Sequence, residues 1–306
     1  MRETKFNLTY AKAYFSQNSL IRASCRKSVA SFSFKQNKAK SIMNILITGS
    51  TDGIGKLVAI KLAKAGHKIY LHGRNPDKLA TAIAKLKEET KNERIDGFVA
   101  DFSDLDAVKQ MTQEIKQDRS RLDVLINNAG VYNSKKQSNK EGLDLRFVVN
   151  YLAPFLLTNE LIPLLEKTEK PRILNLSSAA QSPVNYEVFT GQEVRSQSEA
   201  YAQSKLALTM WSFYLAKKEP GINVIAVNPG SLLNTKMVAE AFGKSWSPAD
   251  KGANILYELA VSEDYQGASG KYFDNNKGTF GEAHPDAYNE TKIDKLITTT
   301  TTILAD

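Results

Sequence analysis

The strongest constraint on the fold is a short apolar run that ends in three closely spaced glycines. The stretch NILITGSTDGIG places Gly49, Gly53 and Gly55 directly behind the apolar residues Asn44–Thr48, and a helical pattern follows over Lys56–Ala65. A glycine is needed wherever a Cβ would block a close approach or impose an unfavourable φ. This strand–turn–helix unit therefore lets the backbone approach an anionic group at the positive end of a helix.

Six further strand-like runs alternate with helical patterns along the rest of the chain. Helical patterns begin near Pro76 and at Leu105, and the second runs to about Lys116. Strands separated by helices imply right-handed crossovers and a parallel sheet with helices on both faces. We therefore expect a single doubly wound α/β domain of Rossmann type over residues 44–306. The six runs are Lys68–His72, Ile95–Ala100, Leu122–Asn127, Arg172–Ser177, Ile222–Gly230 and Gly270–Asp274.

The net charge of +8 is confined to the first 43 residues. They carry nine basic residues and one acid, Glu3, whereas the remainder carries 32 residues of each sign. This basic, acid-poor extension over residues 1–43 has the composition of an organellar transit peptide, or it is a disordered tail that precedes a true start at Met43. Because the body of the protein is neutral, we expect no nucleic-acid partner.

Composition also bears on membranes, compartment and metals. No apolar run approaches the roughly 18–20 residues that span a bilayer, so we expect no membrane span. The single cysteine, Cys25, forms no internal disulfide, and a reducing compartment is compatible with it. We expect a cytoplasmic protein, or an organellar one if residues 1–43 are a transit peptide. The histidines His67, His72 and His284 are scattered, and we predict no catalytic metal.

Several motifs follow the glycine-rich turn in order, most of them at expected strand ends. They are NNAG (Asn127–Gly130), NYLAPFLLT with Asn150, NLSS (Asn175–Ser178), YAQSK (Tyr201–Lys205), and NPG (Asn228–Gly230) with Thr235 just beyond. Together with TGSTDGIG, whose glycine spacing is Gly-x-x-x-Gly-x-Gly, they resemble the short-chain dehydrogenase/reductase family. The resemblance covers nearly all of residues 44–306.

The pair Tyr201 and Lys205 carries the expected chemistry. Moving a hydroxyl proton near neutral pH needs an acid/base group, and the ordinary tyrosine pKa of about 10 is too high for a base. Residues four apart on a helix share a face, and a nearby ammonium lowers the pKa of a tyrosine. The resemblance implies that Tyr201 is the general acid/base. It also implies that Lys205 lowers the pKa of Tyr201 and holds the nicotinamide ribose.

Two more polar residues complete the catalytic set that the resemblance implies. Ser178 would hydrogen-bond the substrate oxygen and polarise it. Its neighbour Ser177 points to the opposite side if the strand alternation continues, and we choose Ser178 because the family uses the second serine of the pair. Asn150 would help to hold a proton-relay water behind Lys205.

The residues after the second strand indicate which dinucleotide is bound. An NAD enzyme usually places an acid there against the ribose hydroxyls, but this chain has Gly73 followed by Arg74. A guanidinium binds a 2′-phosphate bidentately, so we expect NADP(H) in preference to NAD(H). The cofactor-binding residues that the resemblance implies are Thr48, Gly49, Ser50, Thr51, Asp52, Gly53, Ile54, Gly55, Arg74, Asp101, Phe102, Asn128, Ala129, Gly130, Tyr201, Lys205, Pro229, Gly230 and Thr235.

Two segments bear on the substrate. The 22 residues between Ser178 and Tyr201 exceed the spacing common in the family and resemble the retinol dehydrogenase-like branch. Apolar residues in this insertion, which either line the pocket or pack the loop down, are Tyr186, Val188 and Phe189. A segment that the family uses as a mobile lid follows Thr235 and favours a lipophilic substrate. Its apolar residues, which would equally suit a helix packed on the sheet, are Met237, Val238, Phe242 and Trp246.

We therefore predict an NADP(H)-dependent oxidoreductase that transfers a hydride between nicotinamide and a carbonyl/alcohol pair. It would act on the CH–OH group of donors, the EC 1.1.1 type. A cofactor-binding sensor or scaffold without turnover is the alternative. A sugar-nucleotide epimerase is a third option, although its usual glycine spacing differs and this chain lacks a large C-terminal substrate domain. By analogy with the family, we expect a homo-oligomer that associates through the helices carrying Asn150 and Tyr201.

Overall fold

Eight short strands form one sheet at the centre of the structure. The computed structural model describes residues 41–243 and 247–305. Within them the strand order is β3-β2-β1-β4-β5-β6-β7-β8, and every neighbouring pair is parallel except β7 and β8. The strands are β1 (Asn44–Ile47), β2 (Lys68–Gly73), β3 (Ile95–Val99), β4 (Val124–Asn127), β5 (Arg172–Leu176), β6 (Asn223–Asn228), β7 (Lys271–Asp274) and β8 (Thr279–Gly281).

The central strands are apolar on both faces because helices cover both. In β1, Ile45 and Ile47 pack into one apolar cluster while Leu46 packs into the other, and all three side chains are fully buried. Successive side chains on a strand point to opposite faces, so a strand between two helical layers must be apolar throughout. Strands of this kind can therefore be recognised in the sequence as continuous apolar runs.

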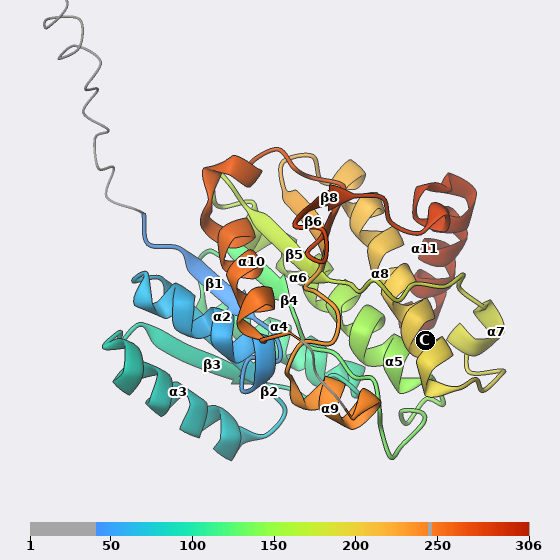
Figure 1. The fold of residues 1–306 in the computed structure, drawn as a ribbon, viewed down its shortest axis with the longest axis horizontal. Helices are drawn as coiled ribbons and strands as arrows, with labels where there is room; N and C mark the ends of the chain where they lie inside the picture. The colour runs from blue at the N-terminus through green and yellow to red at the C-terminus, as the bar shows by residue number, and fades with distance from the viewer. Residues whose placement is uncertain (1–40, 244–246, 306) are drawn as a thin grey trace, which may run out of the picture. The chain divides into compact units, whose positions relative to one another are not determined.

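Helices form a layer on each side of the sheet (Figure 1). The first apolar cluster includes residues of α2 (Gly53–Lys64), α3 (Pro76–Thr90) and α10 (Asp250–Val261). The second includes residues of α4 (Leu105–Asp118), α5 (Leu145–Phe147), the π-helix η1 (Val148–Leu152), α6 (Ala153–Leu165), α7 (Tyr186–Phe189), α8 (Gln197–Lys218) and α11 (Glu290–Ala305). The remaining elements are α9 (Lys236–Phe242) and two short 3-10 helices, η2 (Glu263–Tyr265) and η3 (Pro285–Tyr288).

The chain changes direction across the sheet between β1 and β4. From β1 it builds outward through β2 to β3, and it then returns to place β4 on the other side of β1. The loops that leave the carboxyl ends of β1 and β4 therefore diverge, and ligands of such sheets bind in the crevice between them. The expected doubly wound, single-domain α/β fold is confirmed for the described residues.

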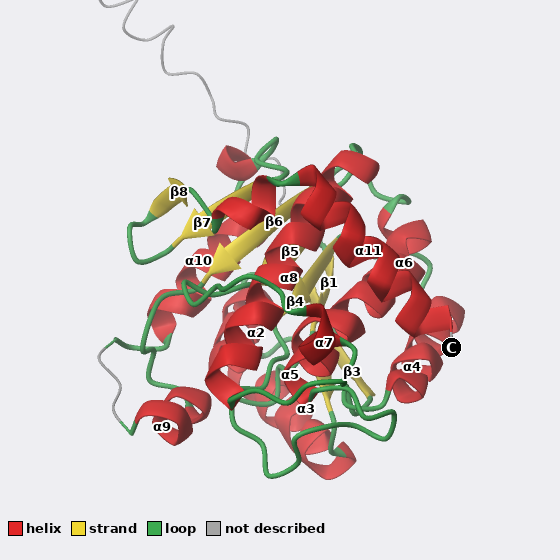
Figure 2. Cartoon of the chain, turned by 90° about the vertical axis from the view of Figure 1, so that its right-hand side faces the viewer, coloured by secondary structure: helices red, strands yellow, loops and turns green. Residues whose placement is uncertain are grey.

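Several features of the fold were not expected from the sequence. The strand β8 forms the antiparallel edge of the sheet, and the C-terminal helix α11 packs against α8 (Figure 2). The expected strand Ile222–Gly230 ends earlier, at Asn228, because the backbone turns at the following proline and glycine. The predictions for residues 1–40 of the basic extension lie outside the described residues.

One helical run corrects the expectation that no stretch approaches the length of a membrane span. Residues Leu145–Leu165, which comprise α5, η1 and α6, are long and apolar enough to cross a membrane by length and composition. The core helix of a globular protein has the same properties, and 61% of the apolar window in this run is buried inside the protein.

Candidate active site

The expected cofactor loop is held by hydrogen bonds between the ends of β1 and β4. The hydroxyl of Thr48 accepts the backbone N–H groups of Asn128 and Ala129, each at 2.9 Å. The Asn128 side-chain amide donates to the carbonyls of Thr48, at 2.7 Å, and Gly49, at 2.9 Å. These four bonds fasten the two loops that diverge at the change of direction, so they shape the crevice between them.

Two glycines of the loop are required by this arrangement. Gly49 has a φ of +62°, and a Cβ built on it would lie 2.8 Å from the Cα of Ala129. A Cβ on Gly55 would lie 2.4 Å from the Asn128 amide nitrogen, which makes the bonds described above. The glycines at these positions thus allow the loop after β4 to pack closely against the turn and the start of α2. This role is additional to the expected close approach of a pyrophosphate.

The helix α2 presents its N-terminus to the crevice. Asp52 has extended backbone angles and its carboxylate accepts the N–H of Gly53 at 2.7 Å, so it caps a twelve-residue helix. Ile54 lies on the first turn. The positive end of a helix dipole favours an anion at this place. The buried Ser50 hydroxyl donates to the carbonyl of Ile47 at 2.8 Å and holds the turn that precedes the helix.

A buried histidine connects three of the segments expected around the adenosine. His72, at the end of β2, accepts the N–H of Gly49 through Nδ1 at 3.0 Å, so its proton is on Nε2, which donates to the carbonyl of Ala100 at 3.0 Å. Its ring stacks on Phe102 with a centroid distance of 4.2 Å. Burial lowers the pKa of His72 to about 4, against the raising effects of the Ala100 hydrogen bond and the Asp101 charge. The sequence motifs give no sign of this role for His72.

The residues expected near the adenine and its ribose lie at the ends of β2 and β3. Arg74 is exposed immediately beyond β2. Asp101 is held by its own turn, because its carboxylate accepts the N–H and the hydroxyl of Ser103 at 2.9 and 2.8 Å. A Cβ on Gly73 would lie 2.6 Å from Cγ2 of Thr51, so the fold leaves little room for an acidic side chain at position 73.

Asn150 lies on a distorted turn of helix. Residues Val148–Leu152 form a π-helix between α5 and α6, and single π-turns of this kind are frequent at functional sites. The side-chain oxygen Oδ1 of Asn150 accepts the backbone N–H of Val131 at 2.7 Å. The side-chain nitrogen Nδ2 of Asn150 donates to the Ser204 hydroxyl and to the Val131 carbonyl, each at 3.0 Å. The side chain thus connects the segment after Gly130 to α8.

Ser178 and Tyr201 are brought together at the end of β5. Desolvation raises the pKa of Tyr201, a hydrogen bond to Ser178 lowers it by less, and the nearby Tyr132 raises it further, so the net pKa is raised. The rings of Tyr132 and Tyr201 lie 4.8 Å apart. Ser177 is buried on the other side and shares a 2.6 Å hydrogen bond with the Thr209 hydroxyl. This arrangement supports the choice of Ser178 over Ser177.

Lys205 differs from the expectation in what it does to Tyr201. Its ammonium is buried and donates to the carbonyl of Leu176 at 2.6 Å, and desolvation lowers its pKa to about 8. The nitrogen lies 5.6 Å from the centre of the Tyr201 ring. In this geometry the expected lowering of the Tyr201 pKa by Lys205 is not found, because burial disfavours charge on both groups.

The segment after β6 faces the cofactor loop. The Pro229 carbonyl accepts the Asn275 amide at 2.8 Å, and Gly230 follows with a φ of +119°. Thr235 caps α9 by accepting the N–H of Val238, and its methyl group would lie 3.9 Å from a Cβ built on Gly53. The segment therefore begins α9 across the crevice from the start of α2.

The expected lid is folded over the site. The methyl group of Met237 would lie 3.8 Å from a Cβ built on Gly130, whose other neighbours are Asn150 and Lys205. The Asn133 amide donates to the carbonyl of Glu240 at 2.9 Å and ties α9 to the loop after β4. The side chains of Phe242 and Trp246, which were also expected in the lid, lie outside the described residues.

The insertion before Tyr201 packs down on the protein. The Tyr186 hydroxyl donates to the carbonyl of Lys292 at 3.2 Å, and the Lys295 ammonium lies 4.2 Å from the centre of its ring. Val188 and Phe189 are fully buried, and the Phe189 ring lies 4.9 Å from that of Phe147. Of the two interpretations left open by the sequence, the structure supports packing of the loop.

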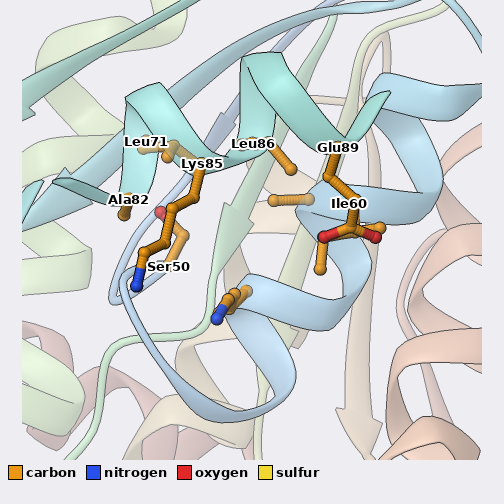
Figure 3. Close-up of a pocket in the computed structure, with 9 residues that line it drawn as sticks. Ser50, Ile60, Leu71, Ala82, Lys85, Leu86 and Glu89 are labelled. Carbon is orange, nitrogen blue, oxygen red and sulfur yellow. The ribbon is translucent and has the colours of Figure 1, made fainter. Parts of the chain in front are cut away.

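A cleft of about 80 Å³ lies between α2 and α3 (Figure 3), and Tyr201 is not among the residues that line it. Lys85 extends there toward Ser50. The cleft is lined by Ser50, Lys56, Ala59, Ile60, Leu71, Ala82, Lys85, Leu86 and Glu89. Among the described residues, no group of three or more histidine, cysteine or acidic side chains could hold a metal ion.

Known proteins resemble this chain in sequence. A family model of short chain dehydrogenases matches residues 43–245. Polyprenol dehydrogenase of Homo sapiens is 32% identical over 255 residues, which cover 76% of this chain and 77% of that protein. Retinol dehydrogenase 13 of Mus musculus is 31% identical over 249 residues, which cover 75% of each.

Solved structures share the fold. A short-chain dehydrogenase from Escherichia coli CFT073, complexed with NADPH, matches with a TM-score of 0.64 and 28% identity over 76% of this chain and 96% of that one. A second, from Shigella flexneri 2a and complexed with NADP, matches with a TM-score of 0.63 and 29% identity over 78% and 100%.

Fold, site and relatives together define an NAD(P)-dependent oxidoreductase that acts on alcohols. The chain belongs to the short-chain dehydrogenase family, and its curated relatives support membership of the retinol dehydrogenase-like branch.

The buried His72 gives a pH dependence of stability that can be measured. Between pH 6.5 and about 4 the unfolded chain binds a proton that the folded protein excludes from His72, so the free energy of unfolding falls as the pH falls through this range. The decrease in the free energy of unfolding that His72 causes over this pH range should be about 3 kcal/mol. His72→Gln should be less stable at neutral pH but lose less on acidification, as measured by urea unfolding at about pH 7 and about pH 4.5.

His284→Gln, which removes a half-buried histidine far from the loop in sequence, is the matched control for this experiment. An acid-induced loss in His72→Gln as large as that of the wild type would contradict the prediction.

Proposed function

We propose that this protein transfers a hydride between NADP(H) and a lipophilic carbonyl/alcohol pair, with Tyr201 as the general acid/base. The observation that carries the proposal is the placement of Tyr201 beside Ser178 at the end of β5, with Lys205 on the next turn of α8. The residues of the crevice fit a dinucleotide, because the start of α2 faces it at one end and the buried Lys205 lies at the other. The bound nicotinamide supplies or accepts the hydride, and the residues of this chain handle the proton.

The proton chemistry follows from the burial of Tyr201. Because its pKa is raised, the phenol keeps its proton at neutral pH, which is the form that donates to a carbonyl oxygen. The Ser178 hydroxyl oxygen accepts the N–H of Ala180 at 3.1 Å. Its own O–H is directed at Tyr201, and in this proposal it donates to the substrate oxygen when substrate binds and orients that oxygen beside Tyr201.

Lys205 and Asn150 support the proton transfer in this proposal. A lysine with a pKa of about 8 gives up its proton near neutral pH far more readily than an ordinary one, so Lys205 can resupply Tyr201 after each turnover. Asn150 bonds to the Ser204 hydroxyl, which in turn donates to the Tyr201 carbonyl at 2.7 Å. It thereby fixes the turn of α8 that carries the acid/base.

The preference for NADP(H) rests on the surroundings of Arg74. The contact that a Cβ on Gly73 would make with Thr51 disfavours the acid that would bind ribose hydroxyls in an NAD enzyme. The exposed Arg74 guanidinium next to it can take a 2′-phosphate with two parallel hydrogen bonds. Lys85, which extends toward Ser50, adds positive charge beside the cofactor loop (Figure 3).

A lipophilic substrate is supported by the residues around Tyr201. The Tyr132 ring packs beside Tyr201, and Met237 lies over Gly130. Both side chains provide apolar surface, which suits an apolar substrate better than a strongly hydrated one such as a sugar. The names of the relatives, polyprenol and retinol dehydrogenases, refer to apolar alcohols and are consistent with this substrate class.

The cellular location and the oligomeric state of the enzyme are also proposals. We propose a cytoplasmic protein, or an organellar one if residues 1–43 act as a transit peptide, and a homo-oligomer. The oligomer would associate through the helices that carry Asn150 and Tyr201, on surface that α11 leaves open where it packs against α8.

Substitution of the acid/base tests the mechanism. Tyr201→Phe removes the proton donor but keeps the ring, so we expect NADPH to bind as it does to the wild type and turnover to fall at least about 100-fold. The measurement is NADPH absorbance with a panel of aldehydes, ketones and quinones, and NADPH fluorescence for binding. Wild-type activity in Tyr201→Phe would refute the mechanism. Cofactor binding without turnover by the wild type across the panel would favour the sensor or scaffold.

Substitution of Arg74 tests the cofactor preference. Arg74→Glu removes a charge-assisted pair with the 2′-phosphate and adds repulsion, so NADPH should bind about 10- to 100-fold more weakly. NADH, which has no 2′-phosphate, should bind about as well as before. The ratio of the two dissociation constants is measured by fluorescence titration, with Arg94→Glu, a surface arginine after α3, as the control. An unchanged ratio in Arg74→Glu would overturn the assignment.

A further inference from the structure

Ser178 lies beyond the last paired residue of its strand. The ladder between β5 and β6 ends where Leu176 pairs with Val227, so the sheet does not hold the backbone of Ser178. Two side chains hold it instead. The Ser178 carbonyl accepts the hydroxyl of Tyr272 at 3.0 Å and the amide of Gln181 at 2.8 Å.

The reach of Tyr272 follows from the register of three neighbouring strands. Tyr272 in β7 pairs with Ala226 in β6, which pairs with Asn175 in β5, so the three side chains share one face of the sheet. The small side chain of Ala226 leaves space for the Tyr272 ring to extend toward β5. Burial raises the pKa of Tyr272, so its hydroxyl keeps the proton that it donates to Ser178.

Gln181 is held at both ends of its amide. Its nitrogen donates to the Ser178 carbonyl, and its oxygen accepts the N–H of His284 at 3.2 Å. These two bonds fix which way the amide points, because its nitrogen can only donate and its oxygen can only accept. The segment that precedes η3 is thereby connected to Ser178 through a single side chain.

We infer that Tyr272 and Gln181 are positioning residues for Ser178. Two donors that approach one carbonyl from different elements fix the orientation of the peptide that follows Ser178. That peptide leads directly to Ala180, whose N–H binds the Ser178 hydroxyl oxygen. The two side chains therefore set the direction of the hydroxyl toward Tyr201 without touching the substrate. The inference rests on the proposed role of Ser178 in hydride transfer.

The test removes each hydrogen bond while keeping the shape of the side chain. Tyr272→Phe and Gln181→Met should each lower kcat about threefold to tenfold, which is the effect of one net hydrogen bond on the orientation of the serine. The KM for NADPH and its dissociation constant should stay at their wild-type values, because neither residue faces the expected cofactor loop. The double variant should lose more than the product of the two single losses, because the remaining donor partly holds the carbonyl in each single variant.

The same substitutions in a Ser178→Ala background separate positioning from general loosening. There Tyr272→Phe and Gln181→Met should cause no further loss of kcat, because the group that they orient is gone. An equal loss in that background would overturn the inference. Gln181→Met, in a half-buried loop, serves if Tyr272→Phe does not fold.

Tyr151→Phe is the matched control, since it also removes a buried tyrosine hydroxyl, one bonded to Thr300. It should lower the melting temperature and leave kcat unchanged, and a loss of kcat equal to that of Tyr272→Phe would again overturn the inference. Failure of the proposed function is distinguishable from these outcomes. In that case the wild type consumes no NADPH, or Ser178→Ala keeps full activity, and both proposals fall together.

Discussion

The hydrogen bonds between Thr48 and Asn128 are the interaction on which the site depends. They join the ends of β1 and β4 at the place where the sheet changes direction, and a side chain on Gly55 would collide with the Asn128 amide. Because Gly55 lies on the first turn of α2, the same close approach aims the positive end of that helix at the crevice. The crevice, the anion site and the loop after β4 are therefore consequences of one packing constraint.

Burial acts on the reactive pair in a consistent direction. It raises the pKa of Tyr201 and lowers that of Lys205, so it favours the neutral form of an acid and of a base on the same helix. The two pKa values are thereby moved apart, with Lys205 the stronger acid, so proton transfer from the Lys205 ammonium to a Tyr201 phenolate is favourable. The same burial disfavours phenolate, so in this geometry the protonated tyrosine is the resting form.

The sequence predicts the parts of this structure that are local or that are buried on both sides. Strands such as β1 are apolar runs because helices cover both faces, and the four-residue spacing of Tyr201 and Lys205 places them on one face of α8. Other features depend on tertiary structure. The π-turn at Asn150 follows from packing against Val131 and Ser204, and the contact of Tyr272 with Ser178 joins residues 94 positions apart through the order of three strands. The proximity of Lys205 to Tyr201 is visible in the sequence, whereas the desolvation that raises the Tyr201 pKa is not.

The insertion between Ser178 and Tyr201 shows why apolar residues near a site need not line it. Tyr186 bonds to α11 and Phe189 packs on Phe147, so the apolar residues of this segment stabilise the C-terminal helix and the core. The apolar surface near Tyr201 comes instead from Tyr132 and Met237, on segments that the Asn133 amide joins through the Glu240 carbonyl. Access to the site and the shape of its apolar wall therefore depend on the same contact. A substrate that displaces Met237 must also break or accommodate that hydrogen bond, which couples substrate size to the position of α9.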